Sequence, residues 1–118
     1  MDYTVKIYEF TASLPTEEKY NLTSQLRRSA ASVPLNIAEG SASSTNTDFS
    51  RFLSYGYRSL KETISTLELC QRLHPSMSRV SIADLIDEGN QISRMIHSLI
   101  QKICPTESQW RRSPTQNS

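Results

Sequence analysis

Residues 45–73 read TNTDFSRFLSYGYRSLKETISTLELCQRL, and their apolar positions recur every three or four residues. The recurring positions are Phe49, Phe52, Leu53, Gly56, Leu60, Ile64, Leu67, Cys70 and Leu73. This spacing predicts an amphipathic α-helix whose apolar stripe keeps its register for about seven turns. Thr45 with Asp48 resembles a capping box at its start, and Pro75 breaks the run after its end. We expect this to be the longest helix of the protein.

Two shorter helical patterns precede this segment. The first covers residues 2–13, is ended by Pro15, and carries the stripe Tyr3, Ile7, Phe10 and Leu14. The second starts at Thr16, which two glutamates follow, because a hydroxyl and carboxylates suit the free amides and positive dipole of a helix start. It runs to Gly40 with the stripe Leu22, Leu26, Ala30, Val33 and Ile37. A polar loop of Ser, Thr and Asn then leads into the long helix.

A fourth helix is predicted to begin at Ser81 or a few residues earlier and to stop before Pro105. Its seam consists of Ile82, Leu85, Gly89, Ile92, Ile96, Leu99 and Ile103. No window shows the period-two alternation of a strand. Four helices joined by short polar connections predict an all-α fold, an antiparallel up-down-up-down four-helix bundle.

Pro34 lies inside the second helical pattern. Proline cannot donate a hydrogen bond to the carbonyl of Ala30 and clashes with it, so we expect a kink or a break between Ala30 and Val33. Gly40 follows the last residue of the stripe, where a left-handed residue that ends a helix is least strained.

The chain has 118 residues, enough for one domain. We expect the bundle to cover residues 1–104 and a flexible polar tail to cover residues 105–118, where Trp110 is the main apolar residue. The first helix is only about three turns long, so it leaves part of the third and fourth helices uncovered. This favours self-association.

Charge and cysteine usage narrow the class of protein. The formal net charge is +1, which gives no strong field for nucleic acid or acidic membrane. No membrane span or secretory signal is recognised, so a cytoplasmic location and no membrane partner are expected. Cys70 and Cys104 lie on apolar stripes and are expected as packed, reduced thiols. His74 and His97 lack metal-ligand spacing, and no cofactor, metal or small-molecule substrate is expected.

Residues 20–40, YNLTSQLRRSAASVPLNIAEG, resemble the signature of small bacterial four-helix-bundle proteins named for intervening sequences in 23S ribosomal RNA genes. The similarity continues through Asp48, Phe49, residues 51–53 and Gly56 to residues 58–62, and more loosely to Ile103. It implies a bundle that assembles as a homo-oligomer, typically a pentamer, without known catalysis. Two departures are the start at Met1, almost inside the first helix, and the arginine-rich end.

The same family resembles, more distantly, the accessory variability determinant of diversity-generating retroelements. That protein is a pentameric partner of a reverse transcriptase and binds nucleic acid. The resemblance therefore implies RNA, or a reverse-transcriptase-like protein, as a partner. The residues singled out as family motif or interface are Ser32, Pro34, Asn36, Glu39, Gly40, Tyr55 and Tyr57.

The most basic part of the fold lies between Tyr20 and Lys61. Its cations are Arg27, Arg28, Arg51, Arg58 and Lys61, against Glu39 and Asp48, an excess of three. Arg51 and Arg58 are one heptad apart and share a helix face. Repeated around a ring, this excess would suit phosphates. The alternative is a solvated face with ion pairs, for which Asp48 with Arg51 and Arg58 with Glu62 have suitable spacing.

The aromatic and polar neighbours of this region also have two interpretations. Tyr55 and Tyr57 would stack on single-stranded bases or cover a subunit contact. Asn36 and Glu39 would satisfy backbone groups left unpaired by Pro34, or would form contacts across a subunit interface.

No residue constellation amounts to a reaction centre, so an enzyme is not expected. The primary hypothesis is a non-enzymatic oligomeric module that binds RNA or a nucleic-acid-processing protein through the basic faces of the second and third helices. The alternative is a purely structural or protein-binding homo-oligomer with no nucleic-acid role.

Overall fold

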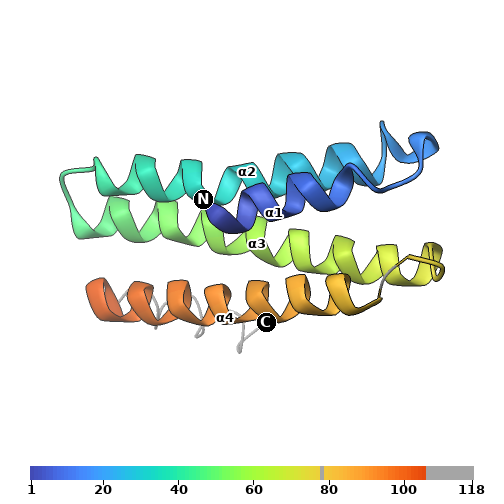
Figure 1. Cartoon of the computed structure of the whole chain (residues 1–118). Coiled ribbons are helices and arrows are strands. Elements are labelled where there is room, and N and C mark those ends of the chain that lie inside the picture. Colours follow the sequence, from blue (N-terminus) through green and yellow to red (C-terminus); the bar gives the residue numbers. More distant parts are fainter. Residues whose placement is uncertain (78, 106–118) are drawn as a thin grey trace, which may run out of the picture.

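The computed structural model describes residues 1–77 and 79–105, and within them the fold is all-helical (Figure 1). The α-helices are α1 (Asp2–Thr11), α2 (Leu22–Ser41), α3 (Asn46–Leu73) and α4 (Arg79–Ile103), with a short 3-10 helix η1 (Thr16–Glu18) before α2. The predictions of an all-α fold, of four helices and of α3 as the longest are confirmed. The predicted tail falls almost wholly on residues 106–118, which lie outside the described residues.

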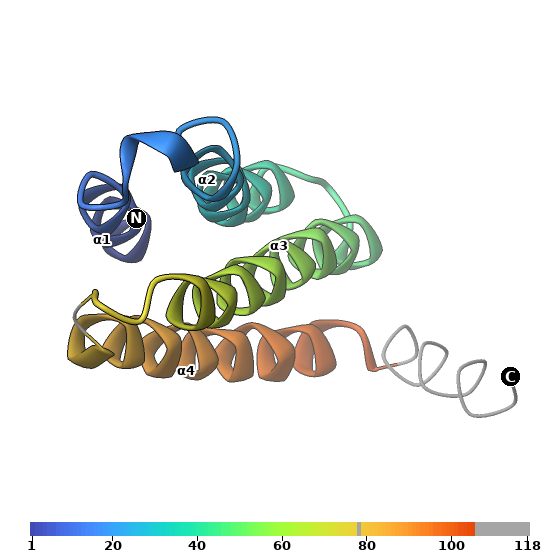
Figure 2. The same ribbon diagram turned by 90° about the vertical axis from the view of Figure 1, so that its right-hand side faces the viewer.

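Helix α3 forms the centre of the arrangement. It packs against α2 on one side and α4 on the other, while α1 packs against α2 and touches α4. Figure 1 shows consecutive helices lying side by side and joined at alternating ends. Figure 2 shows α1 on the same side of the view as the start of α4, which it faces. Because α1 has 10 residues and α3 has 28, α1 covers only part of the length of its neighbours.

The core follows the predicted stripes closely. Buried apolar residues come from all four helices, and the fully buried large ones are Ile7, Leu26, Leu53, Leu60, Leu67 and Ile82. Two stripe positions are wrong. Leu73 is 54% exposed because it is the last residue of α3, and Leu99 is 37% exposed while the next residue, Ile100, is buried in its place.

The start of α3 confirms the predicted cap. The backbone N–H of Asp48 donates to Oγ1 of Thr45 at 3.1 Å, which satisfies one of the free amides of the first turn. The predicted start of the second helix at Thr16 is wrong, since Thr16–Glu18 forms a separate 3-10 helix and α2 begins at Leu22. Oε2 of Glu18 lies 2.7 Å from Nε2 of His74, at the end of α3, so Glu18 serves a tertiary contact.

Helix α2 continues through Pro34 from Leu22 to Ser41, so the predicted break is absent and the kink stays a prediction. The expectation that Gly40 adopts a left-handed conformation is wrong, because no described glycine has a positive φ. Gly40 instead lies where α2 meets the start of α3. A Cβ atom there would lie 2.9 Å from Cδ1 of Phe49 and 2.9 Å from Cβ of Phe52.

Tyr3 joins α1 to α4. Its hydroxyl donates to the backbone carbonyl of Leu85 at 2.8 Å, in the buried interior. Gly89 makes this approach possible, because a Cβ atom at that position would lie 2.7 Å from the Tyr3 hydroxyl. On the surface, Nζ of Lys6 lies 2.9 Å from Oε1 of Glu88 and forms a second link between the two helices.

Candidate nucleic-acid interface

The outward face of α3 carries two of the predicted cations. Arg51 and Arg58 are both exposed, as their heptad spacing on the side opposite the buried stripe requires. An NH2 nitrogen of Arg51 lies 2.9 Å from Oδ1 of Asp48, confirming the predicted ion pair. The side chains of this pair are 52% and 41% exposed. Such a solvated pair contributes at most ~0.5 kcal/mol and leaves the guanidinium accessible to a stronger anion.

Aromatic rings alternate with these cations along α3. The guanidinium carbon of Arg58 lies 5.6 Å from the centroid of the Tyr55 ring, and that of Arg51 lies 5.8 Å from the Phe52 ring. Phe52 and Tyr55 meet edge to face, with their centroids 5.8 Å apart. These contacts pre-organise cations beside flat apolar surfaces, the combination that single-stranded nucleic acid requires.

Lys61 and Tyr57 form a similar pair farther round the helix. Nζ of Lys61 lies 5.8 Å from the centroid of the Tyr57 ring, and the same ring lies 6.0 Å from that of His97 in α4. Tyr57 is half-buried against the core, whereas Lys61 is exposed. Lys61 therefore lies beside a ring that also contacts α4.

Arg27 and Arg28 of α2 have different environments. Nε of Arg27 donates to Oγ1 of Thr11 at 2.8 Å, and its guanidinium carbon lies 4.9 Å from the centroid of the Tyr8 ring. Arg27 therefore ties α2 to α1. Arg28 is exposed on a shallow groove of about 500 Å³ along the outside of α2, which Glu39 also lines. The five predicted cations are thus not brought together in one patch.

Acidic residues interleave with the exposed cations. Arg28, Arg51, Arg58 and Lys61 are exposed, and the carboxylates between residues 20 and 62 are Glu39, Asp48 and Glu62, so three negative charges accompany the four positive ones. The predicted pair between Arg58 and Glu62 is not among the ion pairs of the described residues. Glu62 instead accepts a long hydrogen bond of 3.4 Å from Nε2 of Gln25 in α2. The excess of cations is smaller than the sequence window indicates.

Beneath this surface, small polar residues join α2 to α3. The hydroxyls of Ser29 and Thr63 lie 2.7 Å apart in the interior, and those of Ser32 and Ser59 lie 2.8 Å apart. Such short side chains let the two helix backbones approach closely. The predicted motif residue Ser32 therefore has a place in the contact between the helices.

Asn36 donates from Nδ2 to the backbone carbonyl of Ser32 at 2.8 Å and to its Oγ at 2.9 Å. The carbonyl that Pro34 leaves without its usual partner is that of Ala30, and it accepts a hydrogen bond of 3.1 Å from Oγ1 of Thr4 in α1. Asn36 thus bonds to a residue of its own helix. The carbonyl of Ala30, which Pro34 leaves free, accepts its hydrogen bond from α1 instead, a contact that the sequence pattern does not indicate. Glu39 is exposed, and no hydrogen bond of the kind expected from it is found among the described residues.

The model of a family described as 23S rRNA-intervening sequence protein matches residues 1–98. The chain belongs to this family. The resemblance found in residues 20–40 is therefore confirmed, and the motif residues Ser32, Asn36 and Gly40 of this family member lie on the face of α2 that packs against α3.

The fold is also similar to a solved structure. The crystal structure of a protein with unknown function from the S23 ribosomal protein family of Bacteroides thetaiotaomicron VPI-5482 superposes with a TM-score of 0.71 at 21% sequence identity. The match covers 85% of this chain and 96% of that one. Among curated proteins, none matches. At this identity the similarity shows the shared fold.

The two cysteines of the described residues differ in burial. Cys70 is fully buried, and burial raises the pKa of its thiol to about 11, which keeps it protonated. The second predicted thiol, Cys104, is only half-buried. Within residues 1–77 and 79–105, no three His, Cys, Asp or Glu residues cluster as metal ligands, and no helix is long and apolar enough to span a membrane.

Proposed function

We propose that this member of the 23S rRNA-intervening sequence family is a non-enzymatic module that binds RNA, or a nucleic-acid-processing protein such as a reverse-transcriptase-like enzyme. One observation carries the proposal: Arg51, Arg58 and Lys61 are exposed cations of α3, and each lies within 5.8 Å of the centroid of an aromatic ring of the same helix. The scaffold of the proposal is an antiparallel up-down-up-down bundle with α2 kinked at Pro34, in a cytoplasmic protein.

The two kinds of side chain have complementary roles. Arginine and lysine neutralise backbone phosphates and release counterions, whereas aromatic rings stack on bases whatever their sequence. Stacking contributes ~1–3 kcal/mol per base, so two or three rings add affinity without sequence readout. The proposed ligand is therefore single-stranded or loop RNA, which exposes both phosphates and unpaired bases.

One protomer has too little charge for tight binding, since its formal net charge is +1. We therefore include homo-oligomerisation, as a pentamer, in the proposal. A ring of copies repeats the exposed cations Arg51, Arg58 and Lys61 of α3 around an axis. This multiplies the number of phosphates that the assembly binds at once. Arg28, exposed on α2, adds one more cation per copy, and Arg27 keeps its full positive charge while its Nε donates to Thr11.

Filter binding to structured RNA with single-stranded loops tests this proposal. Arg51→Ala combined with Arg58→Ala is expected to weaken binding by at least tenfold, because two phosphate contacts are lost while the rings of Phe52 and Tyr55 remain. The matched control is Arg94→Ala with Lys102→Ala, which removes two exposed cations from α4. Equal weakening by both pairs would show only a general charge effect, and no binding by the unmodified chain would reject the proposal.

The second candidate is a structural or protein-binding homo-oligomer. Its support is two exposed apolar side chains on different faces, Leu35 of α2 at 65% and Met95 of α4 at 69%. Exposed apolar side chains on two different helices suit the head-to-tail contacts of a closed ring, in which one face of a copy meets the other face of the next. Light scattering tests self-association. An oligomer with no RNA affinity favours this candidate, and a monomer at micromolar concentration rejects both.

A further inference from the structure

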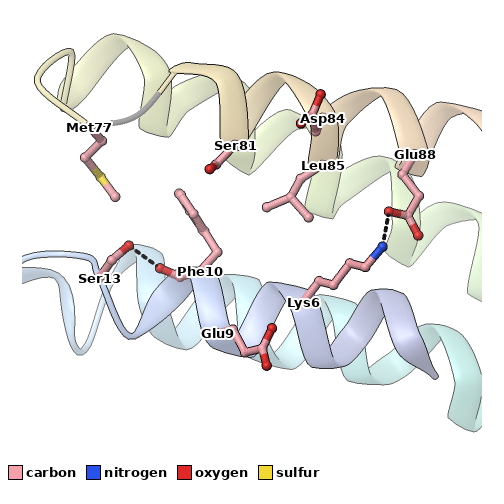
Figure 3. Close-up of a pocket in the computed structure, with 9 residues that line it drawn as sticks. All are labelled: Lys6, Glu9, Phe10, Ser13, Met77, Ser81, Asp84, Leu85 and Glu88. Carbon is pink, nitrogen blue, oxygen red and sulfur yellow. Dashed lines mark hydrogen bonds and ion pairs between the residues drawn. The ribbon is translucent and has the colours of Figure 1, made fainter.

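A groove of about 720 Å³ lies between α1 and the start of α4, and its lining includes no residue of α3 (Figure 3). Its apolar lining consists of Phe10 from α1, Leu85 from α4 and Met77 just before α4. Figure 3 shows Phe10 and Met77 pointing toward one another across the gap. Phe10 and Met77 are partly buried against the core, and Leu85 is a core residue that is 7% exposed, so an apolar side chain entering the groove would meet apolar surface, most of it from Phe10 and Met77.

The rim of the groove is acidic. It carries Glu9, Asp84 and Glu88 against a single cation, Lys6, so three negative charges meet one positive charge and two are in excess. Lys6 and Glu88 are paired at 2.9 Å and close one end, as Figure 3 shows. Glu9 on α1 and Asp84 on α4 remain exposed on opposite rims. The groove therefore suits a ligand with one large apolar side chain beside positive charges.

The sequence of this chain contains such a segment outside the described residues. Residues 109–112 read QWRR, and Trp110 is the only tryptophan of the protein. Tryptophan and arginine are the residue types most enriched among the residues that dominate binding energy at protein interfaces. One aromatic side chain next to two guanidinium groups matches the apolar lining and the two carboxylates of the rims.

Reach favours a second copy as the source of the segment. Leu85 lies 18 residues before the end of α4 at Ile103, which is ~27 Å along the helix. Trp110 lies seven residues beyond Ile103, and seven residues span at most ~25 Å when fully extended. The segment could therefore reach the groove of its own chain only as a fully extended strand folded back along α4, without slack. A second copy has no such limit.

We propose that the groove between α1 and α4 binds the Trp110–Arg112 segment of a second copy of this chain, with Trp110 against Phe10 and Leu85 and the arginines beside Glu9 and Asp84. The contact deepens the self-association part of the proposed function by naming the surfaces that meet. It uses neither the cations of α3 nor RNA, so the nucleic-acid proposal and this one are tested separately.

The fluorescence of Trp110 in the full-length chain reports the contact, because no other tryptophan contributes. At high protein concentration the emission is expected at shorter wavelength than that of a solvated tryptophan, and dilution is expected to move it to longer wavelength as copies separate. Emission typical of solvated tryptophan at every concentration would overturn the proposal, even if light scattering shows an oligomer. Short-wavelength emission that persists at dilutions where light scattering shows a monomer would also overturn it, since the segment would then contact its own chain.

Charge reversal locates the contact. Glu9→Arg with Asp84→Arg is expected to shift the emission to that of a solvated tryptophan, and adding Arg111→Glu with Arg112→Glu is expected to restore it. The matched control, Glu17→Arg with Asp87→Arg, reverses two exposed carboxylates outside the groove and is expected to leave the emission unchanged. An emission that responds equally to both double variants, or is not restored by the swap, would show that the groove is not the binding surface.

Discussion

Thr4 of α1 donates a hydrogen bond of 3.1 Å from Oγ1 to the backbone carbonyl of Ala30 in α2, the carbonyl that Pro34 leaves without its partner. A proline inside a helix normally leaves such a carbonyl to water. Here the side chain of a neighbouring helix takes the place of the missing amide. The proline of the family motif thereby creates an acceptor for α1, and this relationship helps to fix α1 against α2.

The first prediction concerns this pair. Thr4→Val is expected to lower the free energy of unfolding by ~1 kcal/mol, because the carbonyl of Ala30 loses its donor. In a Pro34→Ala background residue 34 regains an amide that bonds the same carbonyl, so the cost of Thr4→Val is expected to fall toward zero. Urea unfolding of the four chains measures this coupling. Equal costs in both backgrounds would contradict the assignment.

Two glycines of the α2–α3 contact give a matched pair. Gly40→Ala places a Cβ atom 2.9 Å from side-chain atoms of Phe49 and Phe52, so it is expected to destabilise the protein by ~1–3 kcal/mol through overpacking. Gly56→Ala meets its nearest atom, the carbonyl oxygen of Val33, at an ordinary 3.5 Å. It is expected to be neutral or to stabilise by up to ~1 kcal/mol through helix propensity. The opposite order in urea unfolding would show that Gly40 is not a packing position.

Cys70 predicts a dependence of stability on pH. Burial raises the pKa of its thiol to about 11 from the usual 9.0, so the unfolded chain loses this proton first as the pH rises. The contribution of the thiol to stability is complete below pH 9, declines between pH 9 and pH 11, and amounts to ~2–3 kcal/mol in total. Unfolding of the unmodified chain should therefore become easier across this window by more than that of Cys70→Ala. Parallel curves would contradict the burial of an intact thiol.

Periodicity predicted the core well because burial repeats with the helix period. Leu53, Leu60 and Leu67 lie on the predicted stripe of α3 and are fully buried. The stripe failed at Leu73, the last residue of α3, which is 54% exposed although Cys70 in the same turn is fully buried.

Local motifs were less informative, because they do not specify tertiary partners. Thr16 and the glutamates after it have the pattern of an α-helix start, yet Glu18 contacts His74, which is distant in sequence. Gly40 has the pattern of a helix end, yet what requires glycine there is the approach of Phe49. At both positions the local pattern indicates the commonest role of the residue type, whereas a contact with another helix determines the role that the residue has in the fold.

The candidate site was predictable as a set of exposed cations on α3 but not as an arrangement. The heptad spacing of Arg51 and Arg58 correctly indicated a shared outward face. The sequence did not distinguish Arg27, which is held by Thr11 and Tyr8, from Arg28, which is exposed. Charge alone does not reveal which cations a neighbouring helix engages.

The salt dependence of RNA binding tests the central proposal most directly. Because each phosphate contact releases counterions, the logarithm of the affinity should fall linearly with the logarithm of the salt concentration. Replacing Arg51 and Arg58 with alanine should reduce that slope by ~1–2 per protomer engaged, while the Arg94→Ala and Lys102→Ala control keeps it. A slope that is the same in the unmodified chain and in the Arg51→Ala, Arg58→Ala variant would contradict nucleic-acid binding through the outer face of α3.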